Sequence, residues 1–181
     1  MRFPFGRSRQ SPVKLAADRL HDVLIAQIRQ PVFYTAFAVP DTFEGRFDLL
    51  VLHAGLVLRR MRELGPEGRD LAQVLVDTMF TRFDVAMREL GVSDIGVPKR
   101  MKRLAEAFKG RTATYDKALG DDGPALSAAI SRNILGRDAA GDPLARYARA
   151  AAAALALASL DALRSGHPAF PDPAVFCEAA V

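Results

Sequence analysis

The residues of this chain that could do chemistry are mainly cations gathered in one stretch. Between Pro98 and Leu119 the sequence PKRMKRLAEAFKGRTATYDKAL carries seven lysines and arginines and two acidic residues, a net charge of +5, whereas the whole chain carries +4. A concentrated positive surface attracts anionic partners at long range. The stretch therefore predicts a docking surface for an acidic partner, and the generic candidates are anionic lipid headgroups and RNA phosphates.

A helical period would divide this basic stretch into two faces. The apolar face consists of Met101, Leu104, Ala105 and Phe108. The outward face carries the cations Lys99, Arg100, Lys102 and Arg103. A charged face of this kind is often no more than a solvated surface. The sequence therefore leaves two interpretations open, a solvated face and a binding face.

Metal-binding and haem-binding residues are scarce. The three histidines fall in different segments, and Cys177 is the one cysteine, so we expect neither a zinc site nor an intrachain disulfide. His53 interrupts the apolar run LLVLHAGLVL. It could be a ligand for haem or a substrate, but we favour a neutral histidine hydrogen-bonded between helices, because buried polar groups normally find such partners. We also keep His53 among the candidate partner-contact residues.

Motifs of catalysis are missing from the sequence. No phosphate-binding glycine loop and no nucleophile elbow is present. Asp77 and Asp84 lie two helical turns apart, but Asp70, Thr81 and Arg88 share their face, which is typical of a solvated surface. We therefore expect no enzyme, no cofactor and no bound metal, and we keep Asp77 as a candidate contact residue.

The elements that position these residues are predicted to be helices throughout. Apolar periods, capping residues and Gly or Pro stops predict seven of them: Pro12 to about Gln30, Asp41–Leu64, Arg69–Leu90, Pro98–Lys109, a short one from Gly110 to Gly120, Asp122–Ile134 and Asp142–Gly166. An Asp41–Glu44 capping box is predicted to begin the second helix, and Gly110 is predicted to break the basic helix. The second helix is apolar on more than one side, so we expect it to be buried and central.

The chain is predicted to be a single all-α domain of six to seven helices with a central buried helix. Residues 1–11 form a basic N-terminal tail in this prediction, residues 12–166 the helical domain, and residues 167–181 an extended C-terminal tail with three prolines. The longest charge-free runs, Leu49–Leu58 and Ala150–Leu160, are about half of the roughly 20 apolar residues that cross a bilayer. The basic start has no apolar signal core, so we expect a protein of the cytoplasm.

Several short motifs, in order along the chain, resemble one known family. They comprise Phe33-Tyr34, Thr42-Phe43, Leu52-His53, Arg59 to Arg62, Asp77 to Phe80, then Phe108, Gly110, Arg111, Tyr115, Asp122, Leu126 and Arg132-Asn133. Together they span about residues 33 to 136. In this pattern the chain resembles the ubiquinol-cytochrome c chaperones, which are assembly factors of respiratory complex III.

The resemblance implies a chaperone that holds newly made cytochrome b. It also implies that Arg111, Tyr115, Arg132 and Asn133 meet in space near Gly110, either as contact anchors or as packing residues. Phe108 and Gly110 of the same pattern are candidate contact residues too. Mitochondrial members work near the ribosome with a small helical partner. The Ala- and Arg-rich composition looks bacterial, so we expect action at the cytoplasmic face of the inner membrane, with the basic helix against anionic lipid or ribosomal RNA.

Two other functions stay open on the sequence. A helical regulator could bind nucleic acid through Lys99 to Arg111, for which a compact helix-turn-helix would be needed. The Gly91–Pro98 loop is long for such a turn. A haem-handling protein using His53 is the third candidate.

Overall fold

The computed structural model describes residues 11–89, 91–136 and 141–177, and these residues form helices and no strand. The α-helices are α1 (Pro12–Ile28), α2 (Val32–Thr35), α3 (Phe43–Glu63), α4 (Pro66–Glu89), α5 (Gly96–Leu119), α6 (Ala125–Ile130), α7 (Asp142–Ala156) and α8 (Leu160–Arg164). A π-helical turn, Ser131–Leu135, continues α6, and a 3₁₀ turn, Pro173–Phe176, lies near the C-terminus. The predicted all-α class is confirmed.

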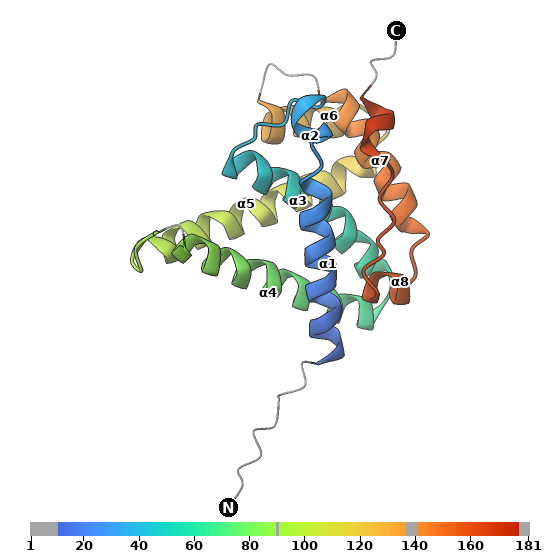
Figure 1. Cartoon of the computed structure of the whole chain (residues 1–181). Helices are drawn as coiled ribbons and strands as arrows, with labels where there is room; N and C mark the ends of the chain where they lie inside the picture. Colours follow the sequence, from blue (N-terminus) through green and yellow to red (C-terminus); the bar gives the residue numbers. More distant parts are fainter. Residues whose placement is uncertain (1–10, 90, 137–140, 178–181) are drawn as a thin grey trace, which may run out of the picture.

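Helix α3 is the centre of the fold (Figure 1), as predicted. It packs against α1, α4, α5 and α7, and its buried side chains surround the whole helix from Phe47 to Met61. A helix that is apolar on all sides must be covered on all sides. The other helices therefore form a shell around α3, and the sites described below are built on its two ends.

The start of α3 differs from the predicted capping box. The cap is Thr42, whose hydroxyl accepts a hydrogen bond from the Gly45 amide, and Asp41 instead forms an ion pair with Arg46 at 2.6 Å. A Cβ on Gly45 would lie 2.0 Å from the Pro40 carbonyl oxygen. Glycine is therefore needed where the Pro40 segment crosses the first turn of α3.

The prediction that Gly110 breaks the basic helix is wrong. Helix α5 runs without interruption from Gly96 to Leu119, with the buried Phe108 before Gly110 and the buried Tyr115 after it. Packing of α5 against α3 and α4 outweighs the low helix propensity of glycine. The predicted last helix is in turn divided into α7 and α8, with Leu157 and Ser159 at the junction. A short helix, α2, was not predicted.

Replacing Gly110 with alanine is expected to raise the free energy of unfolding by about 0.5–1 kcal/mol, since glycine inside a helix is less favourable than alanine by this amount. A Cβ on Gly110 would meet no atom within 4 Å, so the substitution introduces no clash. Urea denaturation measures the change. An unchanged or lower midpoint would show that the helix is bent or open at this position.

The C-terminal segment, predicted to be extended, packs against the core. From α8 the chain runs back beside α7 and ends its described part in the 3₁₀ turn (Figure 1). Phe170 contacts the His53 ring at a centroid distance of 5.3 Å, and Phe176 contacts Tyr147 at 5.9 Å. Apart from Ser11, which caps α1 as predicted, the basic N-terminal tail lies outside the described residues.

Candidate functional site

Helices α4 and α5 form a hairpin arm that projects from the body of the molecule (Figure 1). Four aromatic rings support its base in an edge-to-face series that joins α3, α4 and α5: Phe47 to Phe83 at 5.7 Å, Phe83 to Phe80 at 5.8 Å, and Phe80 to Phe108 at 5.6 Å between centroids. Such pairs add stabilisation beyond the area they bury. Phe108, a predicted contact residue, is therefore buried and holds the arm in place.

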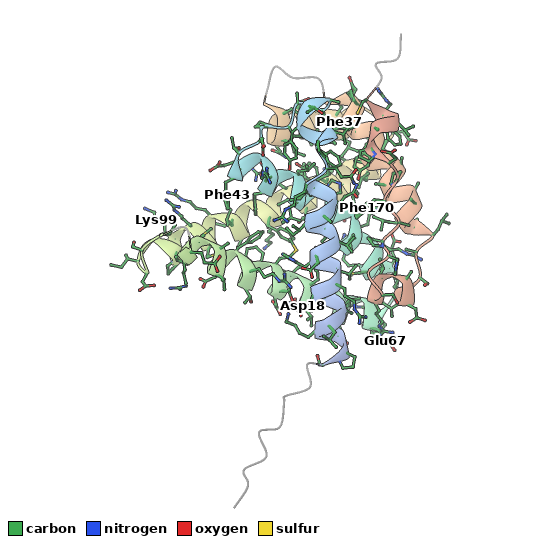
Figure 2. The ribbon with its side chains drawn as sticks, viewed as in Figure 1. Asp18, Phe37, Phe43, Glu67, Lys99 and Phe170 are labelled. Carbon is green, nitrogen blue, oxygen red and sulfur yellow. The ribbon has the colours of Figure 1, made fainter. Side chains whose placement is uncertain are left out.

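A groove of about 580 Å³ lies between the arm and the first turns of α3. We call it the arm groove, and its lining residues are Phe43, Glu44, Phe47, Asp48, Met87, Val92, Arg100, Arg103, Leu104, Ala107 and Arg111. Helix α5 supplies five of these at helical spacing, so one face of α5 is one wall. Phe43, which is 45% exposed, stands on the opposite wall, on the same side of the molecule as Lys99 (Figure 2).

The inner end of the arm groove holds an ion pair between α3 and α5. The Arg111 guanidinium donates a hydrogen bond to the Asp48 carboxylate and also lies over the Phe47 ring, 5.9 Å from its centroid. Asp48 is buried, and this burial raises the pKa of its carboxyl to about 6 although the Arg111 charge acts in the opposite direction. Each partner thus depends on the other for compensation of its charge.

Tyr115 follows Arg111 by one helical turn and is fully buried. Its hydroxyl has no hydrogen-bond partner within the described part of the chain, and burial raises its pKa to about 12. The Asn133 side chain and the charges of Arg111 and Arg132 act on the same hydroxyl and oppose that rise. Arg111, Arg132 and Asn133 thus lie near enough to the Tyr115 hydroxyl to affect its pKa. The π-helical turn supplies Arg132 and Asn133, and α5 has no break at Gly110.

The predicted basic face is exposed as expected. Lys99, Arg100, Lys102 and Arg103 all have exposed side chains. Arg100 and Arg103 border the arm groove, whereas Lys99 and Lys102 are not among its lining residues. Ala105, predicted on the apolar face, is exposed, because Leu104, Ala107 and Phe108 form the buried and half-buried face of this part of α5.

Asp77 is exposed on α4 and lies outside the arm groove. Its carboxylate accepts a hydrogen bond from the Gln73 amide at 2.9 Å. This contact joins two residues one turn apart on the same helix, as is usual on a solvated surface.

His53 is completely buried, so its predicted role as a contact residue is wrong for this structure. Its Nδ1 donates to the Leu49 carbonyl oxygen at 2.8 Å, and its Nε2 accepts from the Tyr147 hydroxyl at 2.8 Å, which in turn accepts from the Gln27 amide at 2.9 Å. Burial lowers the pKa of His53 to about 4. Both ring nitrogens are engaged, so this is the neutral, interhelical histidine that the sequence favoured over a haem ligand.

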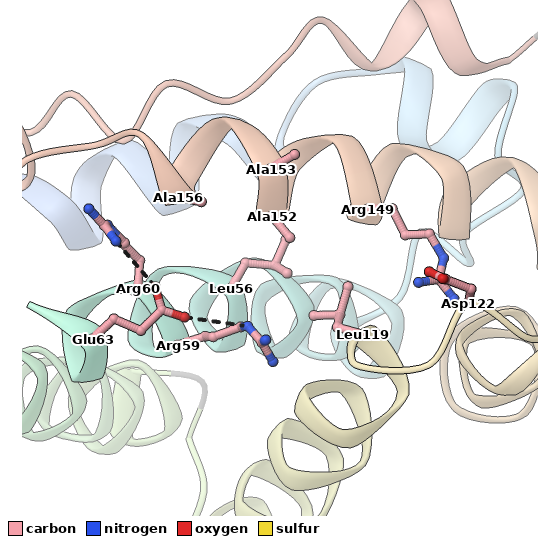
Figure 3. Close-up of a pocket in the computed structure, with 10 residues that line it drawn as sticks. All are labelled: Leu56, Arg59, Arg60, Glu63, Leu119, Asp122, Arg149, Ala152, Ala153 and Ala156. Atoms are coloured by element: carbon pink, nitrogen blue, oxygen red, sulfur yellow. Dashed lines mark hydrogen bonds and ion pairs between the residues drawn. The ribbon is translucent and has the colours of Figure 1, made fainter.

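A second hollow, of about 340 Å³, lies between α3 and α7 (Figure 3). Its arginines are engaged within the fold: Arg60 pairs with Glu63 at 3.2 Å and donates to the Ala158 carbonyl oxygen, and Arg149 donates to the Asp121 carbonyl oxygen at 2.6 Å. Arg59 pairs with Asp116 at 2.7 Å. These contacts fasten helix ends together, so we assign this hollow no binding role.

Residues 11–89, 91–136 and 141–177 contain neither a cluster of metal-binding side chains nor a helix suited to cross a membrane. No three His, Cys, Asp or Glu side chains among them gather as a metal site. None of the helices in these ranges combines the length and the apolarity that spanning a membrane requires. The helical hairpin of α4 and α5, two helices of 24 residues each, also differs from the compact helix-turn-helix that a nucleic-acid-binding regulator would need.

Comparison with known proteins identifies the family to which the chain belongs. The family described as ubiquinol-cytochrome C chaperone matches residues 35–170, which include the arm groove, the Asp48–Arg111 pair and Tyr115. The chain belongs to this family. The resemblance predicted from short motifs is thereby confirmed, and the matched region extends beyond residue 136 to the C-terminal segment on His53.

Proteins similar to this chain come from mitochondria and from bacteria. The ubiquinol-cytochrome-c reductase complex assembly factor 1 of Xenopus laevis is 26% identical over 125 residues, 69% of this chain and 62% of that protein. Protein CBP3, mitochondrial, of Saccharomyces cerevisiae is 29% identical over 107 residues, 58% of this chain and 32% of that protein. The chain thus spans less than two thirds of these curated relatives.

A solved structure agrees over nearly the whole chain. The crystal structure of the Cbp3 homolog from Brucella abortus superposes with a TM-score of 0.78 at 39% sequence identity and covers 90% of this chain and 92% of that one. The all-helical fold is therefore shared with a bacterial member of the family.

Sequence reasoning missed the α3 wall of the arm groove, above all Asp48. Asp48 is an acidic residue directly before the apolar run LLVLHAGLVL, and an acid beside a buried helix segment signals a partner elsewhere. That partner, Arg111, lies 63 positions further along the chain, too far for any local pattern to identify it.

Proposed function

We propose that this protein is an assembly chaperone for ubiquinol-cytochrome c reductase and that cytochrome b is its client. The observation that carries the proposal is the family match over residues 35–170. Relatives from frog and human that are named complex assembly factors support it. The likeness to a Brucella protein supports a bacterial setting, and we place the site of action peripherally at the inner membrane face.

The arm groove is the surface at which the client binds. An amphipathic or transmembrane helix binds by laying apolar side chains into a hydrophobic groove. Phe43, Phe47 and Leu104 offer apolar walls, and about 580 Å³ is room for a few client side chains. Arg100 and Arg103 border the groove, where they attract acidic groups and helix C-termini that flank an apolar client segment.

The experiment replaces Phe43 with aspartate in the native host. Phe43 is the first residue of α3 and 45% exposed, and an acid in the first turn of a helix is compatible with folding. Loss of an aromatic contact residue weakens binding by about thirtyfold, from a typical 2 kcal/mol. Assembled cytochrome b is expected to fall towards the level of a gene deletion, with its transcript unchanged.

Leu157→Asp is the matched control. Leu157 is 88% exposed at the end of α7 and does not line the arm groove, so this variant is expected to support normal cytochrome b levels. Full cytochrome b in the deletion strain would refute the proposed function. If Phe43→Asp supported as much assembled cytochrome b as wild type, the client would instead bind at a surface other than the arm groove.

A further inference from the structure

The tip of the arm carries an apolar side chain that the fold does not use. Ile95 is 91% exposed in the turn between α4 and α5, and Pro98 beside it is exposed too. The arm projects, so its tip lies away from the other helices (Figure 1). Ile95 is the most exposed large hydrophobic side chain among the described residues. A single exposed apolar residue is common on protein surfaces, so its meaning depends on the charges around it.

The charges around Ile95 are nearly all positive. From Gly91 to Arg103 the sequence has four cations, Lys99, Arg100, Lys102 and Arg103, and one acid, Asp94. Asp94 is already paired with Arg88 at 2.5 Å. Within the described ranges, Lys102 approaches Glu106 at 4.0 Å, and no ion pair involves Lys99, Arg100 or Arg103. The tip thus consists of the exposed Ile95 followed by four cations that are largely without acidic partners. We call these four cations, Lys99, Arg100, Lys102 and Arg103, the collar.

We propose that the arm tip docks on an anionic lipid bilayer, with Ile95 inserted at the boundary of headgroups and acyl chains and the four cations among the headgroups. Interfacial binding combines buried apolar area with attraction to anionic lipids, and each cation near such a surface adds to the affinity. RNA phosphates would account for the cations but not for Ile95. The projection of the arm lets the tip penetrate before the body of the protein reaches the headgroups.

This geometry places the arm groove next to the membrane surface. Arg100 and Arg103 belong both to the collar and to the rim of the groove. An apolar client segment could therefore pass from the bilayer into the groove without crossing open water. The inference rests on the proposed site of action at a membrane but not on the identity of the client.

The test uses the fact that the chain contains no tryptophan. Ile95→Trp makes the tip the sole indole fluorophore of the full-length protein, and Leu157→Trp provides a matched reporter at the end of α7, where Leu157 is similarly exposed. With vesicles of phosphatidylcholine and phosphatidylglycerol, the emission of Ile95→Trp is expected to shift to the blue and to be quenched by brominated acyl chains. Leu157→Trp is expected to show neither effect.

Two further variants separate the apolar contribution from the charge contribution. Ile95→Ser, which removes the aliphatic side chain without changing the charge, is expected to weaken vesicle affinity at least tenfold, as follows from burial of one aliphatic side chain. Lys99→Gln is expected to weaken it about fivefold, and pure phosphatidylcholine vesicles are expected to bind poorly. Circular dichroism of each variant confirms folding.

The inference is overturned if Ile95→Trp emission stays unchanged on vesicles, if Ile95→Ser binds vesicles like wild type, or if the protein binds RNA but does not bind vesicles. Vesicle binding is measured without client, so its failure would leave the cytochrome b proposal standing. Conversely, normal cytochrome b in a deletion strain would refute the chaperone role without affecting the fluorescence result.

Discussion

Arg111→Ala is expected to lower the free energy of unfolding by about 3 kcal/mol at neutral pH, since removing one partner of a buried ion pair leaves the other charge uncompensated. The stranded group is Asp48, which is buried within α3 and has Glu44 as an acidic neighbour. Loss of the Arg111 contact with the Phe47 ring adds to the effect. Chemical denaturation of the purified variant measures the change.

The pH dependence identifies Asp48 as the cause. Burial raises the pKa of Asp48 to about 6 even beside Arg111, and removal of the arginine raises it further. A buried acid with a raised pKa destabilises the folded state when ionised, and protonation relieves this as the pH falls through the folded-state pKa. The loss of unfolding free energy in Arg111→Ala relative to wild type is therefore expected to become smaller as the pH falls from 7 to 5.

Asp48→Asn combined with Arg111→Ala provides the control. The neutral amide fits the same space without a buried charge, so the double variant is expected to recover most of the lost stability. If the double variant lost as much unfolding free energy as Arg111→Ala, Arg111 would act through packing alone. The same reasoning affects functional tests: alanine at Arg111 and Tyr115 lowers the amount of folded chaperone, so Phe43 is the better position at which to test client binding.

The outcome at particular residues shows which features a sequence can predict. The His53 environment was predictable because a single histidine inside an apolar helical run has to find local or interhelical hydrogen bonds. The exposed cations were predictable because the period of α5 separates them from Phe108. These are properties of one helix at a time, which is the scale on which apolar periodicity carries information.

Features that depend on two distant segments were not predictable. Gly110 was predicted to interrupt the helix because propensity disfavours glycine, yet contacts of α5 with α3 and α4 outweigh a cost of about 1 kcal/mol. The arm groove needs Phe43 and Leu104 on opposite walls, and no local pattern joins them. The prolines of the C-terminal segment predicted extended chain, but not that Phe170 and Phe176 would cover His53 and Tyr147.

Acidification from pH 6.5 to pH 4 is expected to destabilise the protein by about 3 kcal/mol through His53 alone, at 1.36 kcal/mol for each unit of pKa difference. Burial lowers the pKa of His53 to about 4, whereas an unfolded chain has an ordinary histidine. The unfolded state therefore binds more protons in this range, and stability falls as the pH falls. Asp48 acts in the opposite direction between about pH 6 and pH 4, because its pKa is raised in the folded state.

Comparison with His53→Gln isolates the histidine contribution from that of Asp48 and from His21, whose pKa is also lowered by burial. Glutamine can accept the hydrogen bond from Tyr147 but does not titrate, so the variant is expected to lose about 3 kcal/mol less than wild type over this pH range. Equal slopes of unfolding free energy against pH for wild type and His53→Gln would mean that His53 gains a proton without unfolding of the protein. The Tyr147 hydroxyl would then have to turn and accept a hydrogen bond from the Nε2 proton. Phe170 would also have to move to admit water to the ring.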